Sequence, residues 1–354
     1  MKKATIVVLS MVATLLGCSP AEQSQTGKQP KAEQAQQVET KEVNIYSYRQ
    51  PFLIEPILAK FTEQTGITAN IVYAKSGLVE KLKKEGEYSP ADILLTSDFA
   101  RLMEMTESGL SQVVESDVLD TNIPAQFRDE QHHWYALTKR VRNVYASKAR
   151  LADLQDISYE ALANPEYQGK ICMRSGKHPY NLGLVASMIA HHGEADTKTW
   201  LEGLKANQAR KPQGNDRAQV RAIKEGECDL AIGNSYYFGK MLLDPEQKVW
   251  ADSVNILFPN QQDRGSHINV SGVAMTKHAP NKQHAIALIE FLSSAQAQQD
   301  YAEVNMEYPV NPNVKASQMV ASWGDFKEDS IALSEIVKHR ATAIKLLDEV
   351  KFDL

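Results

Sequence analysis

Apolar and polar residues along this chain switch repeatedly between the period of a half-buried strand and the period of an amphipathic helix. From residue 43, VNIYSY predicts a strand, PFLIEPILAKFTEQTG a helix that stops at Gly66, and ITANIVYA a second strand. SGLVEKLKKEGE then predicts a helix that ends at Gly86, and ADILLTSD predicts a third strand. Because strand and helix alternate, we expect an α/β fold whose sheet is mainly parallel and flanked by helices.

The alternation resumes after the stretch RDEQHHWYALTKRVRNVYAS. The later segments are, in order, a strand GKICMRS, helices NLGLVASMIAHHG and RAQVRAIKEGE, a strand CDLAIGN, a helix YYFGKMLL, an extended stretch HINVSGVAMTK and a long helix NKQHAIALIEFLSSAQAQQDYAEV. Ligands of open α/β sheets bind outside the carboxyl ends of the strands. We therefore expect a binding cleft between two α/β units.

The first residues follow neither pattern. Lys2 and Lys3 precede an apolar run over residues 4–16 that is too short to span a bilayer, and LLGC ends at Cys18. This arrangement predicts a signal peptide over residues 1–17, because a buried helix would not require charge, length and cysteine to coincide. The ending LLGC resembles the bacterial lipobox, in which the cysteine is lipidated, so Cys18 is the expected lipidation site.

Residues 18–42 are rich in Gln, Lys, Glu, Ala and Ser and contain almost no large apolar side chain. Such a segment buries too little surface to offset the entropy lost on ordering, so we expect a flexible tether. The expected protein is thus a periplasmic or extracytoplasmic lipoprotein, anchored in membrane lipid.

Composition places the rest of the chain among soluble globular proteins. The whole chain has 354 residues, a net charge of −5, 43% hydrophobic and 23% charged residues. This length suits two domains, and the composition shows no excess of basic residues that would indicate nucleic-acid binding. Apart from Cys18, it contains Cys172 and Cys228, an even pair in an oxidising compartment. Each lies in or next to a predicted strand. If those strands are neighbours in a parallel sheet, the sulfurs can form a disulfide; two unpaired buried thiols are the alternative.

The stretch AIGNSYYFGKML places Tyr236 and Tyr237 where a strand ends and a helix begins. Tyr236 follows Cys228 by eight residues, and Tyr180 follows Cys172 by eight, so two adjacent strands would bring phenols to one edge. A phenol ionises at about pH 10, and a trivalent cation would ionise it completely at neutral pH. Oxygen anions suit Fe(III), and three phenolates would neutralise its charge and leave room for an anion or water. The alternative is a sugar, polyamine or peptide cleft lined by stacking, hydrogen-bonding tyrosines.

Several longer stretches carry a family resemblance: NIYSYRQP, TKRVRNVYAS, ANPEYQGKICMRS, HPYNLGLVASMIAHHG, ARKPQGNDRAQVRAIKEGECDLAIGNSYYFGKML and EYPVNP. In this order, from about residue 42 to 320, they resemble the periplasmic ferric ion-binding proteins that serve ABC iron importers. The resemblance implies a two-lobed type II periplasmic binding-protein fold, with Fe(III) held by Tyr180, Tyr236 and Tyr237. It also implies an inner-membrane ABC permease as partner, a monomer, and no enzymatic activity.

One stretch departs from the family pattern. Many relatives continue the first strand as Ser-x-Arg-His-Tyr and so supply two further ligands, whereas residues 47–51 of this chain read SYRQP. The chain resembles the subgroup in which three tyrosines bind iron and an exogenous anion, such as carbonate or bicarbonate, completes the shell. Arg49 and Arg140 match basic positions near the family's cleft, and Arg142 is a third candidate for the anion. Any of them could instead form an ordinary salt bridge, and Tyr48 is left unassigned.

The resemblance also divides the folded part into lobes. Residues 43–140 and 265–315 are expected in an N-terminal lobe, and residues 141–264 and 316–354 in a C-terminal lobe. The leading hypothesis is a lipid-anchored ferric iron-binding protein that delivers its ion to an ABC importer. A receptor for an organic or oxyanion solute is the first alternative. An extracytoplasmic enzyme is the second, although no Ser/His/Asp order or nucleophile elbow supports it.

Two pairs of adjacent histidines are further candidate metal ligands, His132-His133 and His191-His192. Adjacent side chains point to opposite faces of a strand, and they lie about 100° apart on a helix. Neither pair is therefore favoured as a zinc site. The second pair is expected to end a helix before Gly193.

Overall fold

The structure is a computed structural model and describes residues 41–354. The expected signal peptide, the lipidation site Cys18 and nearly all of the tether lie outside these residues. Within residues 41–354, no helix combines the length and the hydropathy that are needed to cross a bilayer.

The described residues alternate between strands and helices, as the sequence pattern predicts. The strands are β1 (Glu42–Ser47), β2 (Thr68–Tyr73), β3 (Ile93–Thr96), β4 (Tyr135–Ser147), β5 (Ile171–Cys172), β6 (Leu230–Asn234), β7 (Val254–Leu257), β8 (Ile268–Met275) and β9 (Tyr308–Pro309). The α-helices are α1 (Pro51–Thr65), α2 (Leu78–Glu85), α3 (Phe99–Glu107), α4 (Asp117–Asn122), α5 (Pro179–Ala206), α6 (Asp216–Glu225), α7 (Ser235–Leu243), α8 (Lys248–Ala251), α9 (Lys282–Ser293), α10 (Ala295–Asn305), α11 (Gln318–Ala321), α12 (Leu333–Lys338) and α13 (Arg340–Glu349). Short 3-10 helices are η1 (Gly86–Tyr88), η2 (Ala125–Phe127), η3 (Ala161–Ala163) and η4 (Pro165–Tyr167).

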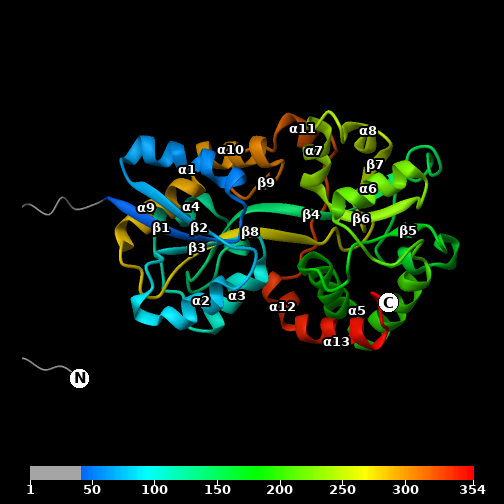
Figure 1. Ribbon diagram of the computed structural model, residues 1–354, viewed down its shortest axis with the longest axis horizontal. Helices are drawn as coiled ribbons and strands as arrows, with labels where there is room; N and C mark the ends of the chain where they lie inside the picture. Colours follow the sequence, from blue (N-terminus) through cyan, green and yellow to red (C-terminus); the bar gives the residue numbers. More distant parts are fainter. Residues whose placement is uncertain (1–40) are drawn as a thin grey trace, which may run out of the picture. The chain divides into compact units, whose positions relative to one another are not determined.

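A long strand, β4, connects two groups of strands. The strand order is β2-β1-β3-β8-β4-β6-β5, and β7 and β9 also pair with β4. The first part of β4 pairs with β8, and its last part pairs with β6 and β7. Figure 1 shows β4 and β8 running side by side between the two halves, each of which is covered by helices.

The sheet is mixed, whereas the alternation of elements alone predicts mainly parallel strands. β1 pairs in parallel with β2 and β3, and β5 pairs in parallel with β6. β8 is antiparallel to β3, and β4 is antiparallel to β6, β7, β8 and β9. Parallel pairing of successive strands requires a crossover connection such as a βαβ unit. β4 and β8 instead run between the two halves, so no such connection makes them parallel to their neighbours.

Each half has its own apolar core. The core of the first half is built on β1, β3 and β8, with buried side chains such as Ile45, Leu94 and Val273. The second half has one cluster around Val144 and Leu230 and another that includes Cys172, Ile223 and Phe238. These cores form because apolar residues of the strands meet the apolar faces of the covering helices. The residue boundaries expected for the two lobes stay a prediction.

Two helices differ from their predictions. Gly193, with φ of 78° and ψ of 176°, interrupts the helix after the second histidine pair as expected, but helical turns resume and α5 continues to Ala206. The single long helix expected over residues 281–304 is in fact two helices, α9 and α10. Ser294 is extended there, and its side chain accepts the N–H of Ala297 and so caps α10.

Candidate metal centre

Three tyrosine side chains come together where two helices begin. Tyr180 is the second residue of α5, and Tyr236 and Tyr237 follow Ser235 at the start of α7. The hydroxyl oxygens of Tyr180 and Tyr236 are 3.4 Å apart, and the ring centroids of Tyr236 and Tyr237 are 4.1 Å apart. All three side chains are partly exposed. The structure thus brings together the three phenols that the sequence singled out.

Local contacts fix both helix starts. Pro179 occupies the first turn of α5, and Nδ1 of His178 accepts the N–H of Tyr180 at 3.3 Å while its ring packs edge-on against the Tyr180 ring. At α7, the hydroxyl of Ser235 accepts the N–H of Val141 on β4 at 3.2 Å. The tyrosines therefore project from helix N-termini, where the helix dipole favours negative charge.

Close packing holds β6 in place beneath α7. The hydroxyl of Tyr145 donates to the carbonyl of Asn234 at 2.8 Å. A Cβ atom at Gly233 would lie 2.3 Å from the Tyr145 ring, so only glycine fits at this position.

The expected disulfide is present between Cys172 and Cys228, whose Cα atoms are 5.8 Å apart. The two strands are neighbours and parallel, as that prediction required, with Cys172 opposite Ala231. The cross-link therefore ties together the two strands whose following segments carry Tyr180 and Tyr236.

The environment of Tyr236 and Tyr237 favours the neutral form of both phenols. Burial raises the pKa of Tyr236 well above its ordinary value, the neighbouring Tyr180 and Tyr237 raise it further, and Arg140 opposes the shift. Burial likewise raises the pKa of Tyr237, with Tyr180 and Asp216 adding to the effect. A bound trivalent cation reverses this balance because it favours the ionised form.

Guanidinium groups surround Tyr180. Those of Arg140, Arg142 and Arg174 lie 5.8, 5.9 and 5.5 Å from the centre of its ring. A narrow recess adjoins the ring and is lined by Arg140, Arg142, Tyr180, Asn234, His267 and Asn269. Arg140 and Arg142 were predicted from the sequence, whereas Arg174 and His178 were missed. Their nearness to Tyr180 in MRSGKHPY is the one signal that could have found them.

The three arginines predicted to bind an anion have different partners. Arg49 is buried and pairs with Glu307 at 2.7 Å, outside the residues that line the recess. Arg142 pairs with Asp216 at 3.2 Å. Arg140 is 1% exposed and donates to the hydroxyl of Ser271 at 2.7 Å, and it forms no ion pair with any carboxylate of residues 41–354. Arg140 is thus the candidate without a direct carboxylate partner among the described residues, although its charge helps to lower the pKa of nearby Glu307.

Tyr48 has a structural role in the first half. Its hydroxyl accepts the N–H groups of Leu78 and Val79 at 2.9 and 3.0 Å and so caps the start of α2. Its side chain is buried, and the guanidinium of Arg101 lies 3.6 Å from its ring centre. The structure does not bring Tyr48 to the three tyrosines.

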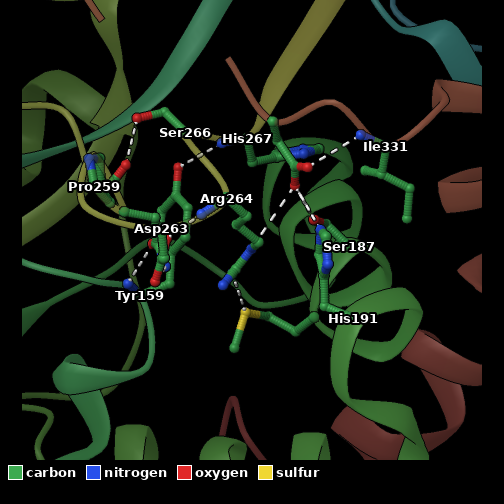
Figure 2. A network of polar contacts seen from close by, with 12 residues as sticks. Tyr159, Ser187, His191, Pro259, Asp263, Arg264, Ser266, His267 and Ile331 are labelled. Carbon is green, nitrogen blue, oxygen red and sulfur yellow. Dashed lines mark hydrogen bonds and ion pairs between the residues drawn. The ribbon is translucent and has the colours of Figure 1, made fainter. Parts of the chain in front are cut away.

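The members of each histidine pair bind different partners. His132 contacts the hydroxyl of Tyr135 at 2.8 Å, whereas His133 contacts the hydroxyl of Ser111 at 3.0 Å. His191 and His192 each bind a carboxylate at 2.7 Å, the first that of Asp329 and the second that of Glu160. The Asp329 carboxylate also accepts the hydroxyl of Ser187 at 3.5 Å and lies 3.8 Å from Nε of Arg264. Figure 2 labels these partners, Ser187, His191 and Arg264. Among the described residues, no cluster of three or more His, Cys, Asp or Glu side chains could hold a metal.

Comparison with known proteins places this chain in a family. The family described as bacterial extracellular solute-binding protein matches residues 57–328. Iron uptake protein A1 of Synechocystis sp. is 43% identical over 88% of this chain and 87% of its own length.

Solved structures agree with this match. The apo ferric ion-binding protein A of Pasteurella haemolytica superposes with a TM-score of 0.86 at 55% identity, over 89% of this chain and 99% of that one. A Trichodesmium protein in complex with iron and citrate superposes with a TM-score of 0.83 at 38% identity, over 88% of this chain and 99% of that one. The two-lobed type II binding-protein fold predicted from the sequence is thereby confirmed. The chain belongs to the ferric ion-binding proteins of the bacterial extracellular solute-binding family.

Proposed function

We propose that this protein binds ferric iron outside the cytoplasmic membrane through Tyr180, Tyr236 and Tyr237 and delivers it to an inner-membrane ABC permease. The observation that carries the proposal is the meeting of three phenols at two helix N-termini, with a 3.4 Å separation between two of the hydroxyl oxygens. Relatives named as an iron uptake protein and a ferric ion-binding protein support the choice of ion. The family binds solutes for transport, so no enzymatic activity is assigned.

The charges around the site favour an anion as the remaining ligand. Three phenolates neutralise Fe(III), and a six-coordinate shell then has room for an oxyanion or water. The buried Arg140, which has no carboxylate partner among the described residues, lies where a bidentate anion would be stabilised. Carbonate or bicarbonate is the anion we propose. A carboxylate is the alternative, since the Trichodesmium relative was solved with iron and citrate.

The N-terminal residues complete the proposed role. A signal peptide over residues 1–17 would export the chain, and lipid on Cys18 would hold it at a membrane. The tether over residues 18–42 would then let a monomeric binding unit reach its permease.

The test of the proposed function is a visible absorption spectrum. Fe(III) added to the purified protein should produce a phenolate-to-iron charge-transfer band that saturates at one ion per chain. A receptor for an organic or oxyanion solute would bind its ligand through the same tyrosines without this colour. A colourless protein after addition of Fe(III) and carbonate would therefore favour that second function.

Iron affinity should rise steeply with pH. The pKa values of Tyr236 and Tyr237 are raised in the metal-free protein, so at neutral pH these phenols carry protons that iron must displace. Acid therefore favours the metal-free form, and the slope of log affinity against pH should approach three, one proton for each phenol. Competition with a chelator of known protonation constants, repeated at several pH values around neutrality, measures the slope. A flat profile would mean that the phenols do not ionise on binding.

A further inference from the structure

Asp216 is a fully buried carboxylate that binds two arginines at once. It is the first residue of α6 and has 0% exposure. Its Oδ1 lies 3.2 Å from Nη1 of Arg142 on β4, and its Oδ2 lies 3.3 Å from Nη1 of Arg174, which follows β5. One carboxylate thus joins three segments that are far apart in the sequence.

Both arginines that Asp216 holds lie against the first tyrosine of the site. The guanidinium of Arg174 is 5.5 Å and that of Arg142 is 5.9 Å from the centre of the Tyr180 ring. Two guanidinium groups of like charge would repel each other at such a place, and the carboxylate between them offsets that repulsion.

Arg142 also contacts residues at the starts of both helices that carry the tyrosines. Its Nη2 donates to Oδ1 of Asn181 at 2.5 Å, and Asn181 follows Tyr180 on α5. Its Nη1 donates to Oδ1 of Asn234 at 3.1 Å, and Asn234 immediately precedes α7. A guanidinium fixed by Asp216 therefore reaches the start of each helix that carries a phenol.

We propose that Asp216 is a positioning residue for the iron site: through Arg142 and Arg174 it sets the relative placement of Tyr180 on α5 and of Tyr236 and Tyr237 on α7. This inference rests on the proposed function. It also distinguishes Arg142 from Arg140. The guanidinium of Arg142 orients the tyrosine ligands, whereas that of Arg140 is free to bind the proposed anion. Residues that orient metal ligands without touching the metal strongly influence metal affinity, because each ligand must meet the ion at a fixed angle and distance.

The test compares two variants of this network with a matched control. Asp216→Asn removes the charge that binds both arginines, and Arg174→Gln removes one arm and leaves the Asp216–Arg142 pair in place. Asp329→Asn is the control, because Asp329 is also a buried carboxylate that binds an arginine, at 3.8 Å from Arg264. Its carboxylate accepts the hydroxyl of Ser187 and the N–H of Ile331 and contacts Nε2 of His191, and none of these partners, which Figure 2 labels, is one of the three tyrosines.

Iron affinity and the position of the visible band are measured together in the full chain. Asp216→Asn should bind iron roughly 10- to 100-fold more weakly and shift the band, because the phenolates meet the ion in a changed geometry. Arg174→Gln should move both quantities in the same direction by less, and Asp329→Asn should leave both at their wild-type values. The band separates positioning from general stability, because a merely destabilised protein would show a wild-type band once loaded.

Three outcomes would overturn the proposal. The first is a wild-type band and affinity in both Asp216→Asn and Arg174→Gln. The second is a loss in Asp329→Asn as large as that in Asp216→Asn. The third applies if Asp216→Asn does not fold: Arg174→Gln then decides, and wild-type behaviour in that variant refutes the role. Absence of any band in the wild-type protein would instead refute the proposed function itself, so the two failures are distinguishable.

Discussion

Replacing Tyr236 with phenylalanine should nearly abolish ferric iron binding and bleach the visible band. The substitution removes an anionic oxygen from the middle of the cluster, where the Tyr236 hydroxyl lies 3.4 Å from that of Tyr180 and its ring lies 4.1 Å from that of Tyr237. The fall in affinity should exceed the roughly 10- to 100-fold that loss of an outer-shell partner costs, because the substitution removes a proposed ligand. Phenylalanine keeps the ring, so packing should be preserved.

Tyr180→Phe and Tyr237→Phe should have effects of the same kind. Each removes one of the three negative charges proposed to balance the ion, so each variant should retain a weaker band at a shifted wavelength. Tyr88→Phe is the control, because this tyrosine is 85% exposed and lies on η1, away from the cluster. Chelator competition and absorption spectra measure all four variants. Wild-type affinity and colour in the three cluster variants would show that the ligands are other residues.

The tyrosine cluster could be predicted from the sequence because each of its members follows a strand end. Tyr236 and Tyr237 come directly after the apolar run that forms β6, and Tyr180 has the same spacing from its cysteine as Tyr236 has. Periodicity locates strands, and parallel neighbours bring their carboxyl ends to one edge. The pairing of β5 with β6 then places both chain segments together, which is what the spacing required.

The partners of the arginines could not be predicted in this way. Glu307, which neutralises Arg49, is 258 residues away in the sequence, and Asp216 is 74 residues from Arg142. No local pattern specifies contacts over such separations, because they depend on how β4, β8 and the covering helices pack. The sequence therefore could not show which of the three arginines has a buried carboxylate partner.

The pattern of apolar residues also could not predict the direction of β4 and β8 or the break between α9 and α10. Strand and helix alternate in this chain, yet β4 and β8 run antiparallel because they cross between the halves rather than closing a βαβ unit. The break between α9 and α10 arises from Ser294, which competes with the helix by capping the next one through its side chain. A serine inside a helical pattern gives too weak a signal to predict such a break.

Removing Arg140 should separate iron binding from its dependence on an anion. Arg140 is buried and forms no direct ion pair with a carboxylate of residues 41–354. Burying a guanidinium without such a pair costs free energy, which a bound anion would offset. Arg140→Gln should therefore bind iron more weakly at high carbonate and lose the rise in affinity that carbonate produces in the wild type. The metal-free variant should lose less stability than a variant that breaks a buried ion pair, since Arg140 forms no direct ion pair among the described residues.

Arg49→Gln should behave in the opposite way and serves as the comparison. Arg49 pairs with Glu307; burial lowers the pKa of the guanidinium, but Glu307, Tyr301 and Tyr236 together raise it above its ordinary value. Its loss leaves Glu307 buried without its partner, so the free energy of unfolding should fall by about 3–5 kcal/mol while the dependence on carbonate remains. Iron affinity measured against carbonate concentration at fixed pH, with urea unfolding of the metal-free proteins, tests both expectations. If Arg140→Gln keeps the wild-type dependence on carbonate, the anion binds elsewhere; if Arg49→Gln loses that dependence with unchanged stability, the guanidinium of Arg49 is the one that meets it.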